Sequence, residues 1–365
     1  MLALSIALLT SGCSGGASQT PSLLGAITLG AITSVSATAY SLWPGSATLP
    51  DGKMLAIYQV GVVGSTINTN LCTKSGVTVT CASPIAFTLP AGYTANDQSL
   101  ALLSNNTLFL SLVLVQTSSG NSYPAYAIGT IGGGDAITWG TTTILSALTG
   151  IPAGYTTDVQ APSPVIQTGA ASLLLPIYAT NDSSGLQISG YITFASLSGG
   201  TPSAFTQIGP NPVTNSMYNE SAGVVLADGH LALLLRHAND FGGESGNYSI
   251  SISPSATTPS FPTPTDGVIN SGGIIGRPAL LSPDGVMLVA VGRCAPQNAN
   301  EISSTTCAWI SHDEGYSWST LSDVGMGLGM DHYDSLNLWQ DGSIGLVQSY
   351  DNGGINVVGY STLSL

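Results

Sequence analysis

The chain has 365 residues, of which only 7% are charged, and a net charge of −14 with five Lys and Arg residues. Nucleic-acid binding requires a basic stripe that displaces counterions from phosphates, so this composition excludes that class of function. The strong helix formers Glu, Lys and Arg are scarce, whereas Gly, Ser, Thr, Val and Ile abound. The composition therefore favours an all-β fold of strands and turns.

The N-terminus carries an apolar run, residues 2–9, that is too short to span a bilayer. Thr10-Ser11-Gly12 then precede Cys13. This arrangement resembles a bacterial lipoprotein signal, which implies a signal peptide over residues 1–12, an acylated Cys13 and a flexible tether over residues 13–24. We therefore expect an exported cell-envelope protein that meets the membrane only through a lipid anchor. The alternative is an ordinary signal peptide with an incidental cysteine.

One pattern recurs from residue 47 onward: an apolar run, a tight turn and an alternating apolar strand. Asp-Gly between such runs is a strong hairpin signal. Each hairpin leaves room for two further strands, so residues 25–365 are predicted to form a six-bladed β-propeller of four-stranded antiparallel blades. A two-domain sandwich is the alternative, and the even spacing of 54 to 63 residues argues against it. The six turns begin at Asp51, Asn105, Thr168, Asp228, Asp284 and Asp341.

The last blade has only three predicted strands after Tyr333. We expect the segment Ala26–Ala37, which precedes the first repeat, to supply the fourth strand. It would then pair in the blade that contains Ile344–Val347, closing the ring and leaving no open sheet edge.

Four of the five cysteines form two local pairs. Cys72 and Cys81 flank a predicted hairpin turn, and Cys294 and Cys307 flank a polar, Asn-rich excursion. Two local disulfides fit an oxidising compartment, and their Cα atoms should lie about 4.4–6.8 Å apart. The alternative is that all four are buried free thiols.

Residues 311–318 read Ser-x-Asp-x-Gly-x-x-Trp. This segment resembles the Asp-box of the sialidase superfamily, which is a structural hairpin turn and not a catalytic element. In such a turn the Ser311 and Asp313 side chains should bond turn amides, Gly315 should take a positive φ, and Trp318 should pack into the blade. His312, within the same turn, is expected to be exposed.

The resemblance extends over residues 40–360. The segment from Glu220 to Arg236 is similar to the sialidase segment with the catalytic Glu and a substrate-binding Arg. Arg293 lies where another such Arg is found, and Tyr333 lies in a segment similar to that of the nucleophilic Tyr. The family's first blade carries Arg-Ile-Pro, whereas this chain has Leu42-Trp43-Pro44.

The sialidase resemblance implies a particular chemistry. A sialic acid carries a carboxylate on its anomeric carbon, which would repel a carboxylate nucleophile, whereas a neutral Tyr hydroxyl deprotonated by Glu avoids that repulsion. Arg grips a carboxylate through paired N–H donors. Tyr333 would then be the nucleophile and Glu220 its base, about 2.6–3.2 Å apart. Arg236 and Arg293 would bind the substrate anion.

Two expected groups have no counterpart at their usual places, the first-blade Arg and the general-acid Asp. Arg277 is an extra arginine that would replace the first, and Trp43 stands at its position as a substrate contact. Asp97 and Asp158 precede the second and third blades at equivalent places, so either is a candidate acid. His237 either lines the site or stands in solvent.

Two functions stay open. The first is a sialidase-like exo-glycosidase that acts on terminal, acidic sugars of glycans, and the second is a non-catalytic surface lipoprotein that binds glycan or protein. Asp331 and Asp334 offer only weak grounds for a cation site, and no His or Cys spacing is typical of a metal site. We therefore expect a monomer with a glycan ligand, no metal and no cofactor.

Overall fold

The computed structural model describes residues 27–36, 41–61, 66–210, 217–238, 246–273, 276–294, 305–319, 322–326, 333–352 and 355–365. Cys13, the predicted signal and tether, and Asp331 lie outside the described residues. Within the described ranges, no helix is long and apolar enough to cross a membrane.

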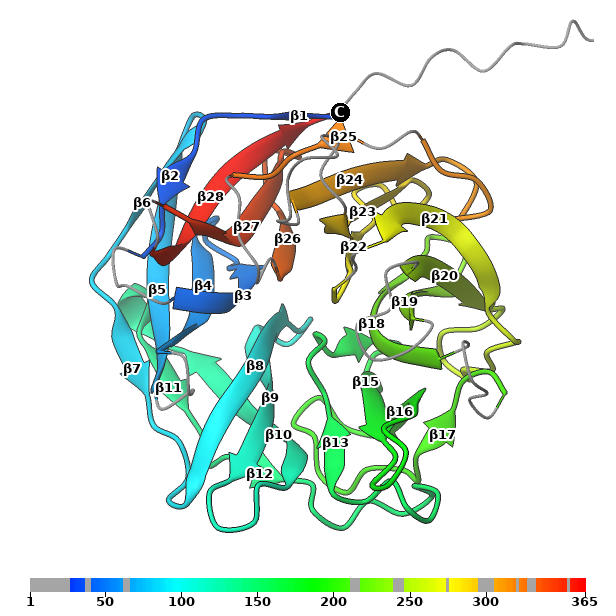
Figure 1. The fold of residues 1–365 in the computed structure, drawn as a ribbon. Coiled ribbons are helices and arrows are strands. Elements are labelled where there is room, and N and C mark those ends of the chain that lie inside the picture. The colour runs from blue at the N-terminus through cyan, green and yellow to red at the C-terminus, as the bar shows by residue number, and fades with distance from the viewer. Residues whose placement is uncertain are drawn as a thin grey trace, which may run out of the picture.

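The regular elements among the described residues are all strands, apart from one short 3-10 turn, η1 (Gly133–Asp135). Their antiparallel sheets stand around a common centre, and in most of them successive strands follow one another outward (Figure 1). This is the arrangement of a β-propeller, so the predicted all-β propeller class is confirmed.

Three of the sheets are meanders. The first comprises β3 (Ser41–Thr48), β4 (Met54–Val60), β5 (Thr66–Ser75), β6 (Thr78–Cys81) and an additional strand, β7 (Ile85–Phe87), which also pairs with β5. The second comprises β18 (Met217–Val225), β19 (Leu231–Ala238), β20 (Gly246–Ser253) and β21 (Thr265–Gly273). The third comprises β22 (Ala279–Leu281), β23 (Leu288–Cys294), β24 (Thr305–Ser311) and β25 (Ser322–Asp323).

A ten-stranded sheet lies between the first two of these in chain order. It consists of two antiparallel halves joined by one parallel residue pair, Ser122 with Asp158. One half comprises β8 (Tyr93–Leu102), β9 (Thr107–Gln116), β10 (Ser122–Ile131), β11 (Ile137–Trp139) and β12 (Thr143–Ile144). The other comprises β13 (Asp158–Gln160), β14 (Ile166–Gln167), β15 (Leu173–Thr180), β16 (Gln187–Phe194) and β17 (Thr206–Gln207).

The last sheet combines both ends of the described chain. β26 (Asp334–Leu338), β27 (Ile344–Asp351) and β28 (Asn356–Ser364) form a meander. β1 (Thr28–Leu29) and β2 (Thr33–Ser34) both pair antiparallel with β28. The predicted pairing of the N-terminal segment in this sheet is therefore confirmed.

The predicted Asp-Gly turns are present, and local hydrogen bonds explain them. Gly52, Gly229, Gly285 and Gly342 all have φ between 80° and 89°, in the left-handed region that glycine enters without steric cost. Each preceding Asp accepts a bond from the backbone amide two residues later, at 2.9 to 3.1 Å. The turn predicted at Thr168 is closed by a bond of the same span as in the Asp-Gly turns, from its amide to the carbonyl of Ser172.

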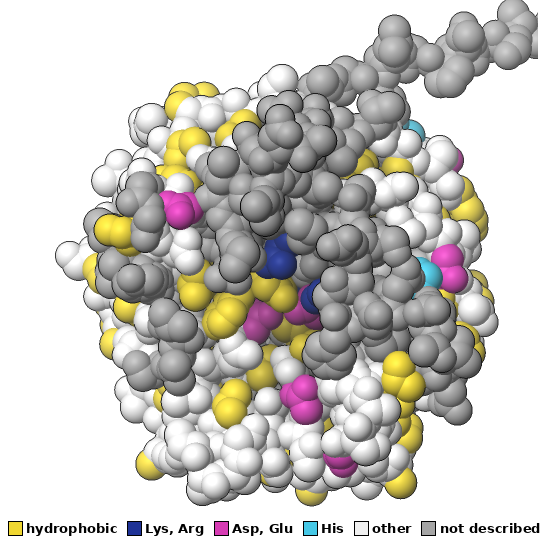
Figure 2. All heavy atoms as spheres, viewed as in Figure 1, with side chains coloured by type: hydrophobic (Ala, Val, Ile, Leu, Met, Phe, Trp, Pro, Cys, Tyr) yellow, Lys and Arg dark blue, Asp and Glu magenta, His cyan; other side chains and the backbone are white. Residues whose placement is uncertain are grey.

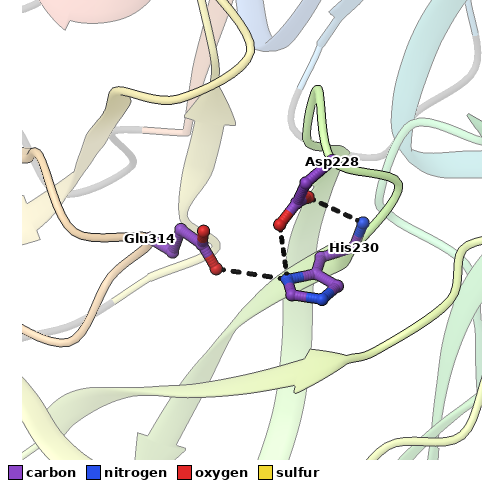
Figure 3. A group of neighbouring side chains, drawn as sticks. All are labelled: Asp228, His230 and Glu314. Carbon is purple, nitrogen blue, oxygen red and sulfur yellow. Dashed lines mark hydrogen bonds and ion pairs between the residues drawn. The ribbon is translucent and has the colours of Figure 1, made fainter. Parts of the chain in front are cut away.

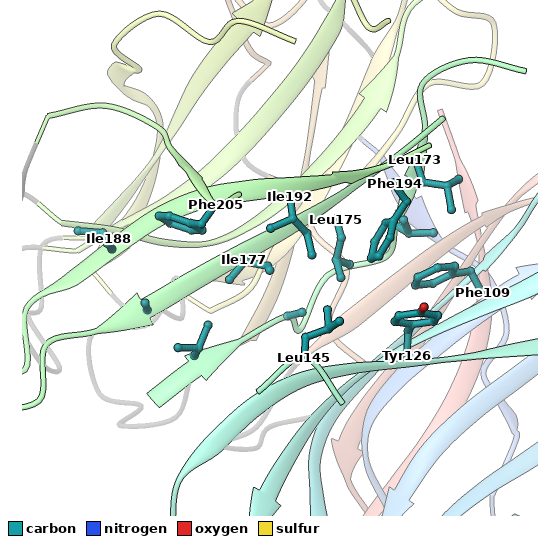
Figure 4. Packing of buried hydrophobic residues seen from close by; sticks show 14 of the residues in the cluster. Phe109, Tyr126, Leu145, Leu173, Leu175, Ile177, Ile188, Ile192, Phe194 and Phe205 are labelled. Carbon is teal, nitrogen blue, oxygen red and sulfur yellow. The ribbon is translucent and has the colours of Figure 1, made fainter. Parts of the chain in front are cut away.

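Apolar side chains fill the spaces between neighbouring sheets. In one such core, the rings of Phe109 and Tyr126 stack at 5.0 Å, and Phe194 packs edge-on to Tyr126 at 5.4 Å (Figure 4). These residues come from both halves of the ten-stranded sheet. Because burying such a side chain stabilises a fold by about 1.5–3 kcal/mol, these cores hold neighbouring sheets in fixed positions.

Both predicted disulfides are present. The Cα atoms of Cys294 and Cys307 are 5.9 Å apart, within the expected range. Those of Cys72 and Cys81 are 3.9 Å apart, slightly below that range. The two residues lie directly opposite each other on β5 and β6, where antiparallel strands bring Cα atoms closest together.

The turn at residues 311–318 has the predicted hydrogen bonds. Ser311 Oγ accepts from the Gly315 amide at 2.7 Å, and Asp313 Oδ1 accepts from the Ser317 amide at 2.8 Å. Gly315 has a φ of 95°, and Trp318 Nε1 donates to its carbonyl. His312 is exposed, as expected.

Candidate active site

Three β-bulges carry side chains of the candidate site. The bulges interrupt the pairing of β3 with β4, of β8 with β9 and of β18 with β19. Trp43, Asp97 and Glu220 occupy them, and Trp43 and Asp97 have positive φ values of 49° and 65°. A bulge bends the strand and re-aims a side chain, while left-handed backbone costs a non-glycine residue about 1–2 kcal/mol. The same local device therefore positions three residues of the site.

Tyr333, Glu220 and Arg236 form a hydrogen-bonded chain. The Tyr333 hydroxyl donates to Glu220 Oε1 at 2.8 Å, and Arg236 Nη1 donates to Glu220 Oε2 at 2.8 Å. Glu220 is 4% exposed, so both carboxylate oxygens are satisfied out of bulk water. The predicted Tyr–Glu distance is thus met, and Arg236 holds the carboxylate from its other side.

Two further guanidiniums flank the ring of Tyr333. The central carbon of Arg277 lies 5.3 Å from the ring centroid and that of Arg293 lies 5.6 Å away, within cation–π range. Trp43 approaches the same ring edge-on, at 6.3 Å between centroids. Among the described residues, Arg293 has no acidic partner within ion-pair distance, and its Nε is buried without a hydrogen bond. Arg293 is therefore the arginine left for an outside anion.

Arg277 is committed to the protein interior. It is 2% exposed, and its Nη1 donates to Asp97 Oδ1 at 2.6 Å and to Ser99 Oγ at 3.0 Å. The same nitrogen also donates to the carbonyl of Pro162. These bonds commit one guanidinium nitrogen of Arg277 to the protein, and the expectation that Arg277 also binds substrate in place of the missing first-blade arginine stays a prediction.

Burial and neighbouring charges shift the pKa values of the site. Burial, and then the Glu220 carboxylate, raise the pKa of Tyr333, while Arg236 and Arg293 oppose them. Burial also raises the pKa of Asp97 to about 7, with Arg277 lowering it and Glu220 raising it. Asp97 can therefore be protonated near neutral pH, as a general acid must be.

Two residues of the site were not among the predicted site residues. Tyr178 is 8% exposed, and burial together with Glu220 and Tyr333 raises the pKa of its hydroxyl. Asp334 is 1% exposed and accepts from Thr306 Oγ1 at 3.3 Å; burial raises its pKa to about 7. Asp334 directly follows Tyr333, so a sequence signal for it existed.

Two predicted residues have no hydrogen bond to the Tyr–Glu pair, although the charge of one of them, Asp158, raises the pKa of Tyr178. His237 packs its ring against Tyr218 at 5.0 Å, and its Nδ1 lies 3.6 Å from Asp266. Adjacent strand residues point to opposite faces, so His237 points away from the face of Arg236, and its expected role in substrate binding is not supported. Asp158 accepts from Gln160 Nε2 at 2.6 Å and makes no hydrogen bond to the Tyr–Glu pair.

One charged cluster lies elsewhere, at the turns of two neighbouring sheets. Within the described part of the chain, Asp228, His230 and Glu314 place three possible metal-ligand atoms within 4.8 Å of one another (Figure 3). His230 Nδ1 lies 2.8 Å from Asp228 and 3.2 Å from Glu314. The imidazole bridges the two carboxylates, which accounts for this arrangement, and the groups are partly exposed.

The site lies near the middle of one face of the molecule. Figure 2 shows basic and acidic side chains side by side in a hollow there, on a face otherwise mostly uncharged. Arg277 and Asp334 also line a cavity of about 50 Å³ among β3, β8, β18, β22 and β26. The charged groups of the candidate site thus gather where the innermost strands converge.

No family model matches the chain, and no curated protein matches it in sequence. Solved structures do share its fold. A Dyadobacter fermentans protein of unknown function has a TM-score of 0.68 at 13% identity, covering 92% of this chain and 99% of that one. The GH93 α-L-arabinofuranosidase of Fusarium graminearum has a TM-score of 0.63 at 12% identity, with 92% and 97% covered. The NanB sialidase of Streptococcus pneumoniae has a TM-score of 0.60 at 12% identity, with 91% and 69% covered.

Proposed function

We propose that this protein is an exported, sialidase-like glycoside hydrolase that removes terminal acidic sugars from glycans. The observation that carries the proposal is the 2.8 Å hydrogen bond from the Tyr333 hydroxyl to a buried Glu220, which Arg236 holds from its other side. Solved structures of the same fold include an arabinofuranosidase and a sialidase, which supports glycoside hydrolysis as the class of reaction.

In the proposed first step, the Tyr333 oxygen attacks the anomeric carbon while Glu220 takes the phenolic proton. The glycosidic C–O bond breaks, and its oxygen leaves with a proton from an acid. In the second step a water molecule attacks the same carbon, the Tyr333 oxygen recovers its proton from Glu220, and the acid is reprotonated by the water. The sugar configuration is retained because two displacements occur.

Asp97 is the better supported acid of the two candidates. It is 6% exposed, its pKa is raised to about 7, and it lies close enough to Glu220 and Tyr333 for their charges to affect one another. Asp158 instead bonds Gln160 beside the junction of the ten-stranded sheet. We therefore assign proton donation to Asp97.

Arg293 is the proposed anchor for the carboxylate of the sugar. Arg236 is tied to Glu220 and Arg277 to Asp97, whereas Arg293 has no acidic partner among the described residues. A guanidinium that has no acidic partner gains most from an incoming carboxylate, which supplies charge-assisted hydrogen bonds.

A panel of aryl glycosides tests the proposed function. The wild type, Tyr333→Phe and Glu220→Gln should each be offered sialosides, other acidic glycosides, an α-L-arabinofuranoside and neutral hexosides. We expect wild-type turnover of an acidic glycoside and a loss of at least about 10³-fold in both variants. Turnover that survives Tyr333→Phe would show that another residue is the nucleophile.

The second candidate function is binding without turnover. Trp43 occupies the first-blade position, where the sialidase resemblance expects an arginine. This substitution favours binding without turnover, because the site then binds an anion more weakly than a three-arginine site does. Retained binding of a glycan by a wild type that cleaves no glycoside in the panel would select this function.

The proposal includes a closed six-bladed ring and a lipid on Cys13. The two halves of the ten-stranded sheet share a single residue pair, which supports counting them as two blades, and the pairing of β1 and β2 with β28 supports closure. Metabolic labelling with a radioactive fatty acid should mark the wild type and not Cys13→Ser.

A further inference from the structure

Arg277 is the largest fully buried side chain among the described residues. It precedes β22, yet its hydrogen bonds reach Asp97 and Ser99 on β8 and the carbonyl of Pro162 between β13 and β14. A buried guanidinium is costly unless it is paired and hydrogen-bonded, and apolar residues often stabilise such a place equally well. A structural role alone therefore gives little reason for an arginine here.

The charged and titratable groups around Asp97 come from four parts of the chain. Arg277 contacts its carboxyl directly, Glu220 on β18 and Tyr333 before β26 affect it through their charges, and the Gln98 amide lies on its own strand. Arg277 also faces the ring of Tyr333 at 5.3 Å. One guanidinium thus touches both the proposed acid and the proposed nucleophile.

We propose that Arg277 is a positioning residue, which holds the Asp97 carboxyl beside the Tyr333–Glu220 pair and stabilises the carboxylate formed when Asp97 gives up its proton. The inference rests on the proposed function. The proton moves from Asp97 to the glycosidic oxygen as the C–O bond breaks and its electron pair goes to that oxygen. The negative charge left on Asp97 then lies 2.6 Å from Arg277 Nη1.

Two opposing effects set the protonation of Asp97. Burial raises its pKa and Arg277 lowers it, with a result of about 7. An acid acts in its protonated form, so the rate should fall as the pH rises through this value. Without Arg277 the backbone hydrogen bond from Gln98 still lowers the pKa of Asp97, but burial and Glu220 then raise it further than in the wild type, and this fall in rate moves to higher pH. Asp97 also becomes a weaker acid, which slows the departure of poor leaving groups.

Leaving-group dependence tests the proposed role. Arg277→Met and Arg277→Lys should be assayed on alkyl and 4-nitrophenyl glycosides of the same sugar. In Arg277→Met we expect kcat for the alkyl glycoside to fall by about tenfold or more beyond any fall for the nitrophenyl glycoside, whose leaving group needs little acid assistance. Arg277→Lys should recover part of that loss because it keeps the charge. A raised KM with equal losses on both substrates would overturn the proposal, since that pattern marks an arginine that grips substrate.

A second measurement does not depend on activity. The ¹³C-carboxyl resonance of Asp97, assigned by its loss in Asp97→Asn, should titrate near neutral pH in the wild type. In Arg277→Met its midpoint should rise by about 1–3 pH units. An unchanged midpoint would refute the proposal whether or not the protein hydrolyses glycosides. If Arg277→Met does not fold, Arg277→Lys carries the test with a smaller expected rise.

Discussion

At the residue scale, the site combines three guanidiniums with three buried carboxyl groups. Arg236 and Glu220 form one pair, and Arg277 and Asp97 form another, whereas Arg293 and Asp334 are not paired with each other. Removing one member of a buried pair typically costs about 3–5 kcal/mol, because the other charge is left uncompensated. Substitutions of these arginines should therefore separate into effects on folding and effects on binding.

Arg293→Ala should weaken the binding of an acidic sugar by about tenfold or more, because one or two charge-assisted hydrogen bonds are lost at about 1.5–3 kcal/mol each. Binding of a neutral sugar of similar size should hardly change. Calorimetric titration of both ligands checks this, with Lys74→Ala as a remote control. Arg236→Ala should also weaken acidic-sugar binding, and in addition should lower the free energy of unfolding. Equal losses for both sugars in Arg293→Ala would contradict the assignment of an anion anchor.

Asp334→Asn should change how stability depends on pH. The pKa of Asp334 is raised to about 7 by burial, against about 3.9 in an unfolded chain. Its contribution to stability is therefore fully present below about pH 4 and is lost as the pH rises to about 7. The asparagine variant lacks this loss, so it should gain about 3 kcal/mol relative to the wild type between pH 5 and pH 8. Urea unfolding at both pH values measures this, and parallel curves would refute it.

Sequence reasoning located Tyr333, Glu220, Arg236 and Arg293, because each sits in a segment with a recognisable local pattern. It did not find the pair of Arg277 and Asp97. Those residues are 180 positions apart, and no local pattern links a residue before β22 to a bulge in β8. A contact made across the centre of the molecule depends on how all the sheets are placed.

At the element scale, the disulfide between Cys294 and Cys307 joins β23 to β24 beside Arg293. Replacing both cysteines with alanine should cost about 3 kcal/mol of stability for a loop of this length. It should also weaken acidic-sugar binding, because Arg293 directly precedes Cys294. Replacing Cys72 and Cys81 is the matched control, since that pair lies on another sheet. Unaltered binding in the first variant would show that the strand holds Arg293 without the crosslink.

Alanine substitutions at Gly315 and Gly229 separate two sources of strain in tight turns, backbone conformation and side-chain clash. Both have φ near +90°, but a Cβ on Gly315 would lie 2.1 Å from Ile250 Cδ1, whereas one on Gly229 would meet no atom within 4 Å. Gly229→Ala should cost about 1–2 kcal/mol for its backbone conformation. Gly315→Ala should cost at least about 1 kcal/mol more, because the buried Ile250 must shift. Denaturant unfolding of both variants measures the difference, and equal costs would contradict it.

At the scale of the whole molecule, the sequence repeats predicted the class of fold and the pairing of the two chain ends. Turn chemistry made this possible, since the Asp-Gly turns adopt the backbone that their residues favour locally. The junction of β10 with β13 was not predicted. A single parallel pair depends on how closely two sheets approach, which strand periodicity does not encode.

A truncated chain that starts at residue 37 lacks β1 and β2 and exposes the edge of β28. Open edges pair with other chains, so this variant should melt at a lower temperature and self-associate. A chain starting at Ile27 keeps both strands and is the matched control. Thermal unfolding and size-exclusion chromatography distinguish the two, and identical behaviour would show that the N-terminal strands add nothing to the sheet.

The placement of the arginines affects how readily a protease can cleave the folded chain. A trypsin-like protease cleaves only after Lys or Arg, and the chain offers five such residues. Arg277 is buried and is followed by Pro278, while Arg236 is held by Glu220 and Arg293 lies beside a disulfide. Lys53 and Lys74 both form ion pairs with neighbouring acids. Gathering three of the five cations into one site thus leaves the folded exterior with few bonds that such a protease can cut.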